Sequence, residues 1–89
     1  MGTEEFLNLC KQKVVDYFNN RSEKTDKFQM SLDDVFVVWS CKTLQNNKAL
    51  LSTTVSDGMY YELTFNGDKN ELYFDAYKKW QNICYNLQN

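Results

Sequence analysis

The feature that most constrains the fold is a run of apolar residues at every second position, which begins at Val35 and ends near Tyr77. This two-residue period is typical of strands whose two sides meet different surroundings. Polar interruptions divide the run into four strands, at about residues 35–42, 49–55, 59–65 and 70–77. Because slipping the pairing by one residue would move an apolar row to the other face, the four rows must align. The pattern therefore predicts a four-stranded antiparallel β-meander with one continuous apolar face.

The expected strand pairing follows from the lengths of the loops. Residues 44–48 read as a polar loop. Ser56-Asp57-Gly58 aligns the apolar rows if it forms a three-residue loop, with Gly58 in the left-handed conformation. Asn66-Gly67 is a strong signal for a two-residue hairpin turn. The resulting pairs are Leu51 with Leu63, Val55 with Met59, Tyr61 with Leu72 and Met59 with Phe74. In the first strand the apolar face takes Val35, Val37, Trp39 and Cys41, and the opposite face takes Phe36, Val38, Ser40 and Lys42.

The segment before the strands has the period of a helix. Its apolar residues, spaced three and four apart, are Phe6, Leu7, Cys10, Val14, Tyr17 and Phe18. Thr3 is a favourable N-cap, so we expect a helix over about residues 3–20. Residues 21–34 read as a connector, polar at first and then extended through Phe28, Met30 and Leu32. The helix is the natural cover for the apolar face of the sheet.

Residues 78–89 fit two structures. Trp80, Ile83 and Leu87 match a helical stripe, but the alternation over residues 71–77 favours a strand up to Tyr77. The expected architecture is a single α+β domain over residues 1–89. Its N-terminal helix packs on the four-stranded antiparallel β-meander, and residues 78–89 form a short C-terminal helix or an extended tail.

Composition excludes several kinds of chemistry. The chain has no His, and therefore lacks the commonest metal ligand and the commonest general base. Its three cysteines (Cys10, Cys41 and Cys84) fit neither a disulfide framework nor a zinc site. We interpret them as small buried apolar groups in a reducing compartment. We expect no enzymatic activity, no catalytic residue, no metal and no cofactor.

Sequence features that would direct the chain to a membrane are missing. No apolar run approaches the length needed to cross a bilayer. The first residues are acidic at Glu4 and Glu5, and they do not form a signal-peptide pattern. We therefore expect a cytoplasmic protein.

The second face of the predicted sheet is the candidate binding surface. It combines aromatic and acidic side chains, whereas the solvated face of an antiparallel sheet is usually polar. The candidate partner-binding residues are Phe36, Tyr60, Glu62, Tyr73, Asp75 and Tyr77. Three occupants fit this face: a partner protein, the C-terminal segment of the same chain, or a second copy in a homodimer.

Two other functions use residues of the same region. Lys42, Lys48 and Lys78 could join the tyrosines as a platform for single-stranded nucleic acid or nucleotides. The net charge of −2 and the acidic neighbours argue against that function. Glu62 and Asp75 could lie on one face as a carboxylate pair of the glycosidase kind, although solvated strand carboxylates are far commoner.

Four short motifs are distinctive in their order and spacing: residues 37–50, 57–62, 66–69 and 75–80. Through them, residues 34 to about 84 resemble a family of small phage and prophage proteins of Gram-positive bacteria. Members typically carry Trp after the Leu-Gln-Asn run, where this chain has Asn47. The resemblance implies an accessory protein of the bacterial host cytosol without enzyme activity. By analogy with other phage accessory proteins, its partner would be a host or defence protein.

Overall fold

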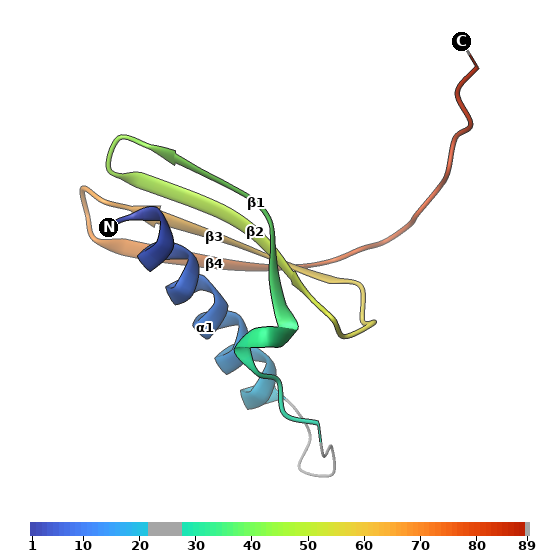
Figure 1. Cartoon of the computed structure of the whole chain (residues 1–89), viewed down its shortest axis with the longest axis horizontal. Coiled ribbons are helices and arrows are strands. Elements are labelled where there is room, and N and C mark those ends of the chain that lie inside the picture. The colour runs from blue at the N-terminus through green and yellow to red at the C-terminus, as the bar shows by residue number, and fades with distance from the viewer. Residues whose placement is uncertain (22–27, 89) are drawn as a thin grey trace.

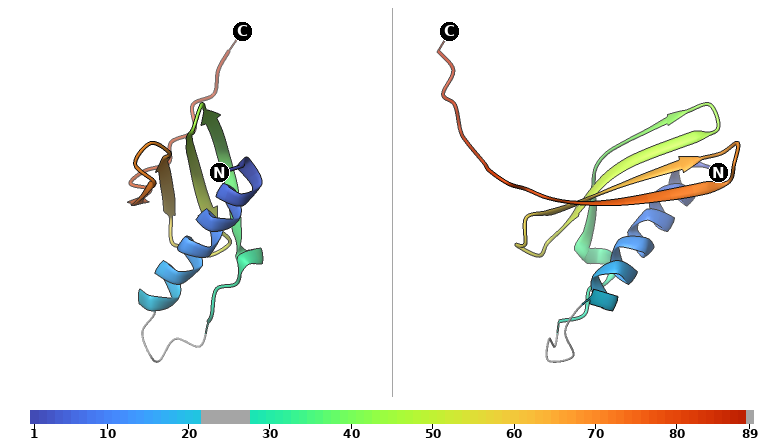
Figure 2. Two further views of the ribbon diagram at one scale, coloured as in Figure 1. Left: turned by 90° about the vertical axis from the view of Figure 1, so that its left-hand side faces the viewer. Right: turned by 180° about the vertical axis from the view of Figure 1, so that it is seen from behind.

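The computed structural model describes residues 1–21 and 28–88. Its elements are α1 (Thr3–Arg21), the short 3₁₀ helix η1 (Leu32–Asp34), β1 (Val35–Thr43), β2 (Asn46–Thr53), β3 (Met59–Asn66) and β4 (Glu71–Lys78). The four strands form one antiparallel sheet in the order β1-β2-β3-β4. Helix α1 lies across one side of this sheet (Figures 1 and 2). The expected α+β architecture is confirmed.

The core lies between α1 and the sheet. Helix α1 buries Phe6, Cys10 and Val14 against Leu51 and Leu63 of the central strands. Removing this apolar surface from water is the main source of stability in a domain of this size.

A cluster of aromatic rings extends the core toward β4. The ring centroid of Tyr17 lies 5.0 Å from that of Phe74 and 5.8 Å from that of Tyr61. These three side chains join the C-terminal half of α1 to β3 and β4.

The end of the connector differs from the expected extended segment. Met30 is held at the end of α1, because the Asn19 side chain accepts from the Met30 amide at 2.9 Å and donates to its carbonyl at 3.1 Å. The chain then forms η1, where Asp34 Oδ2 accepts a hydrogen bond from the Ser31 amide at 2.9 Å. The first part of the predicted connector, residues 22–27, lies outside the described residues.

The predicted register is wrong at two hairpins. Leu51 lies opposite Tyr61 rather than Leu63, a shift of two residues. Leu72 lies opposite Phe65 rather than Tyr61, a shift of four. Both shifts are even, so each strand keeps its predicted apolar face.

Longer loops cause both shifts. After β2, residues 54–58 form a five-residue loop, and the Thr54 amide donates to the Asp34 carbonyl at 2.9 Å, which ties the start of this loop to the end of η1. After β3, the Asn66 side chain accepts hydrogen bonds from the amides of Asp68 and Lys69, at 3.1 and 3.3 Å. That turn is completed at Asn70, which has a φ of 54°. The loop sequences alone did not indicate these bonds.

A β-bulge in β1 makes the predicted faces wrong for the second half of this strand. The register shifts between Val37, opposite Leu51, and Trp39, opposite Leu50. The extra residue is Val38, and such an insertion changes the side on which the following residues emerge. Opposite residues of an antiparallel pair share a face. The second half of β1 is therefore reversed: Trp39 and Cys41 lie on the second face, whereas Ser40 and Lys42 lie on the helix-covered side.

The C-terminal residues 79–88 form an extended tail and no helix. The tail leaves the end of β4 and runs away from the sheet (Figures 1 and 2). It does not cover the second face of the sheet. Its apolar side chains are therefore exposed, Trp80 to 96% and Leu87 to 88%.

Candidate functional site: an open aromatic and acidic sheet face

The candidate site is the side of the sheet opposite α1, which we call the open face. All six residues predicted for partner binding lie on it: Phe36, Tyr60, Glu62, Tyr73, Asp75 and Tyr77. Strand register also places Trp39, Cys41, Lys48, Leu50 and Thr64 there. Phe36, Trp39, Tyr73 and Tyr77 are each between 43% and 53% exposed. Four large aromatic rings are therefore available to a partner.

Cross-strand pairing arranges these side chains in rows. One row crosses the sheet from Phe36 through Ser52 and Tyr60 to Tyr77. The next runs from Trp39 through Leu50 and Glu62 to Asp75. The third runs from Cys41 through Lys48 and Thr64 to Tyr73. The four exposed aromatic rings thus lie on the edge strands β1 and β4, whereas the central strands β2 and β3 carry Tyr60 together with aliphatic, polar and charged side chains.

Among the charged side chains that the structure describes on the open face, Lys48 and Glu62 form an ion pair and Asp75 does not. Lys48 Nζ lies 3.3 Å from Glu62 Oε1. Asp75, directly opposite Glu62, has no ion-pair partner among residues 1–21 and 28–88. The Lys79 ammonium lies 5.9 Å from the centre of the Tyr60 ring, a cation–π distance. The exposed Asp75 carboxylate is therefore free to meet a basic group on a partner.

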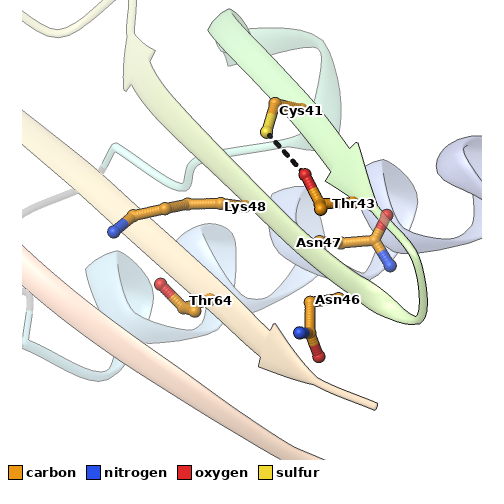
Figure 3. A pocket seen from close by; sticks show the side chains of 6 residues that line it. All are labelled: Cys41, Thr43, Asn46, Asn47, Lys48 and Thr64. Atoms are coloured by element: carbon orange, nitrogen blue, oxygen red, sulfur yellow. Dashed lines mark hydrogen bonds between the residues drawn. The ribbon is translucent and has the colours of Figure 1, made fainter.

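A small hollow lies near the β1–β2 turn (Figure 3). Its volume is about 230 Å³, and its lining residues are Cys41, Thr43, Asn46, Asn47, Lys48 and Thr64. The Cys41 sulfur lies 3.9 Å from the Thr43 hydroxyl. Neither Glu62 nor Asp75 lines the hollow, so this carboxylate pair lies on the sheet surface outside it.

The lysines of the nucleic-acid alternative do not gather at one place. Lys42 donates to the Met1 carbonyl at 3.0 Å, on the helix-covered side. Lys48 pairs with Glu62 on the open face. Lys78 lies opposite Met59 at the end of β4, in register with the helix-covered row. The structure therefore forms no continuous basic platform from these three residues, and nucleic-acid binding stays an untested prediction.

The cysteine interpretation is correct for one residue of three. Cys10 is buried in the core, and this burial raises the pKa of its thiol to about 12. Cys41 and Cys84 are exposed, on the open face and the tail. Cys41 is exposed because the bulge turns it to the open face, and Cys84 is exposed because the tail does not pack on the sheet.

Trp39 and Cys41 lie on the open face although the sequence pattern placed them on the helix-covered side. Residues 35–39 are all apolar, so the sequence does not distinguish the two faces there and nothing in that strand marks the bulge. In the structure the β1–β2 turn contains only Leu44 and Gln45. With so short a turn, Val37 could align with Leu51 only if one extra residue entered β1. The polar loop expected at residues 44–48 concealed this conflict.

One protein family matches the sequence over residues 7–87, and it is described as "Family of unknown function (DUF6275)". The chain belongs to this family. The DUF6275 match includes the whole sheet, and therefore the open face, together with most of the tail. Neither a curated protein nor a solved structure matches this DUF6275 chain significantly. Within the part of the chain that the structure describes, no helix has the length and apolarity to span a membrane.

Proposed function

We propose that this DUF6275 protein is a non-enzymatic binding protein whose open face docks on another protein. The observation that carries the proposal is the exposure of Phe36, Trp39, Tyr73 and Tyr77 on the side of the sheet that α1 leaves uncovered. Aromatic side chains are enriched among the residues that contribute most to protein–protein binding. They offer large contact areas and lose little conformational freedom on binding.

The charges define the partner further. Asp75 lies between the aromatic residues Tyr73 and Tyr77 on β4 and has no ion-pair partner among the described residues. We expect the partner to present apolar side chains to the rings and a Lys or Arg side chain to Asp75. Such charge complementarity contributes mainly to specificity and to the rate of association.

The biological setting of the proposal rests on the resemblance to phage and prophage proteins. It describes an accessory protein that works in the cytosol of a bacterial host and binds a host or defence protein. The proposal needs no cofactor and no catalytic residue.

The test compares three forms of the tagged protein for capture of proteins from a lysate of the bacterial host. Tyr73→Ala removes an exposed ring from the open face. Leu44→Asn is the matched control, because Leu44 is 83% exposed in the β1–β2 turn, and Asn tolerates its φ of 56°.

We expect one protein to be captured by the wild type and by Leu44→Asn. For Tyr73→Ala its affinity should fall by about 30-fold or more, the loss typical of an interface hot spot. Circular dichroism would verify that each variant is folded. Capture of no protein by a chain whose open face is unoccupied, or equal capture by all three forms, would contradict the proposal.

A further inference from the structure

The C-terminal tail is the second unpartnered apolar surface of the molecule. Its ten residues 79–88 include Trp80, Ile83, Tyr85 and Leu87, all of them exposed. Ile83, Tyr85 and Leu87 occupy every second position, so in an extended chain their side chains lie on one side. An exposed apolar segment of this kind marks an interaction site.

The tail and the open face are complementary. The open face offers exposed aromatic rings on its edge strands, and at its centre Leu50 lies beside Glu62. The tail offers four large apolar side chains and only one charged side chain, Lys79. Contact between the two would remove both exposed apolar surfaces from water.

The direction of the tail decides which copy it can reach. The Lys79 amide donates to the Gly58 carbonyl at 2.7 Å, which keeps the start of the tail in line with β4. The chain then continues away from its own sheet (Figures 1 and 2). Folding back onto its own sheet would need a turn in the tail, and none of residues 79–88 forms one in the structure. A second molecule can receive the tail without any such turn.

The tail is also long enough for this contact. Ten extended residues span at most about 33–36 Å. The eight residues of a strand such as β4 span roughly 26 Å. One tail can therefore cross the whole open face of another copy.

We propose that the protein forms a reciprocal dimer in which the tail of each copy, residues 79–88, docks on the open face of the other. The inference rests on the proposed function, because it uses the same face as a docking surface and names one occupant of it. The exchange is symmetric, so both tails and both faces are covered and the assembly closes at two copies. A protein partner of the open face has to displace the tail.

The test measures solution mass by light scattering across a concentration series of the full chain. The tail variant carries Trp80→Ser and Leu87→Ser, and the face variant carries Trp39→Ser and Tyr73→Ser. Leu44→Asn is the control for an exposed apolar residue outside both surfaces. We expect a dimer for the wild type and for the control. In each double variant the dimer dissociation constant should rise by about 30-fold or more.

Mixing the two double variants separates docking from misfolding. The tail variant still has an intact face, and the face variant still has an intact tail, so a mixed pair restores one of the two contacts. We expect the equimolar mixture to associate more strongly than either variant alone. A wild-type chain that stays monomeric at all concentrations would overturn the exchange. So would a dimer that persists in either double variant, or a mixture that associates no better than its components.

The two proposals can fail separately. A monomeric wild type whose captured protein is lost with Tyr73→Ala refutes the tail exchange and keeps host-protein binding. If the wild type forms the tail-exchanged dimer and neither it nor the tail variant captures a protein, host-protein binding is refuted and the exchange is kept.

Discussion

Glu62 and Asp75 lie directly opposite each other on β3 and β4, with both carboxylates on the open face. Two like charges at opposed positions of a sheet destabilise it. Lys48, 3.3 Å from Glu62, offsets part of this repulsion. The chain thus carries an unfavourable pair at the centre of the surface that we propose for binding, and sites of function are where such conflicts are expected.

The first prediction concerns this pair. Asp75→Asn removes one of the two opposed charges and keeps the shape of the side chain. We expect the free energy of unfolding in urea to rise by about 0.2–1 kcal/mol. The gain should shrink with added salt, because the repulsion acts between partly exposed charges.

The control for Asp75→Asn is Glu71→Gln on the same strand, since Glu71 lies opposite the neutral Asn66. We expect it to leave stability nearly unchanged. An equal gain in both variants would mean that the lower net charge, and not the opposed pair, is responsible.

A second prediction concerns the contact between two turns. A Cβ atom at Gly67 would collide with the backbone oxygen of Gln45 in the β1–β2 turn. The Gly67 amide also donates to Asn46 Oδ1 at 2.9 Å. We expect Gly67→Ala to lower the free energy of unfolding by about 1–3 kcal/mol, because one of the turns has to move.

Gly2→Ala is the matched control, because nothing lies within 4 Å of a Cβ at Gly2. Chemical denaturation of both variants would measure the difference. If Gly67→Ala were as stable as Gly2→Ala, the result would contradict the close packing of Gly67 against the β1–β2 turn.

The three cysteines should differ in reactivity. The thiolate is the reactive form, and burial raises the pKa of Cys10 from about 9 to about 12. In the monomer at pH 8, at protein concentrations below those at which the proposed dimer forms, we expect Cys41 and Cys84 to react rapidly with a thiol reagent and Cys10 to react only on unfolding. Counting the modified thiols by mass spectrometry, with and without denaturant, tests this. Fast modification of all three in the native protein would contradict the packing of α1.

A fourth prediction concerns acid stability. The Ser31 backbone amide, by its hydrogen bond, is the largest cause that lowers the pKa of Asp34; the Ser31 and Thr54 hydroxyls add to the effect. A carboxyl whose pKa is lower in the folded state stabilises the fold above its unfolded pKa. This stability is lost as pH falls through the folded pKa. Asp34→Asn should therefore lower stability at pH 7 and reduce the loss between neutral and acid pH.

Thermal unfolding at a series of pH values from 7 to about 2, which brackets ordinary carboxyl pKa values, measures this effect. Asp33→Asn, at the neighbouring position of η1, is the control. A wild-type pH profile in Asp34→Asn would show that the hydrogen bonds from Ser31 and Thr54 to the Asp34 carboxylate do not stabilise the fold.

Much of the fold and of the site follows from the amino-acid sequence by itself. The alternation after Val35 determined four strands and their apolar faces, because side chains in a strand point alternately to two sides. The three- and four-residue spacing determined α1. The same alternation grouped Phe36, Tyr60, Glu62, Tyr73, Asp75 and Tyr77 on one face, and their positions survive register shifts of two and four residues because both are even.

Only the tertiary structure decided the register, the bulge and the course of the tail. Loop lengths depend on bonds between segments far apart in the sequence, such as Thr54 with Asp34 and Gly67 with Asn46. The bulge at Val38 arises because the short β1–β2 turn and the apolar row of β2 demand different registers, and one extra residue satisfies both. The apolar residues of the tail fit both a helix and a strand, so its side chains do not determine its form; in the structure it is extended and lies away from the sheet (Figure 1).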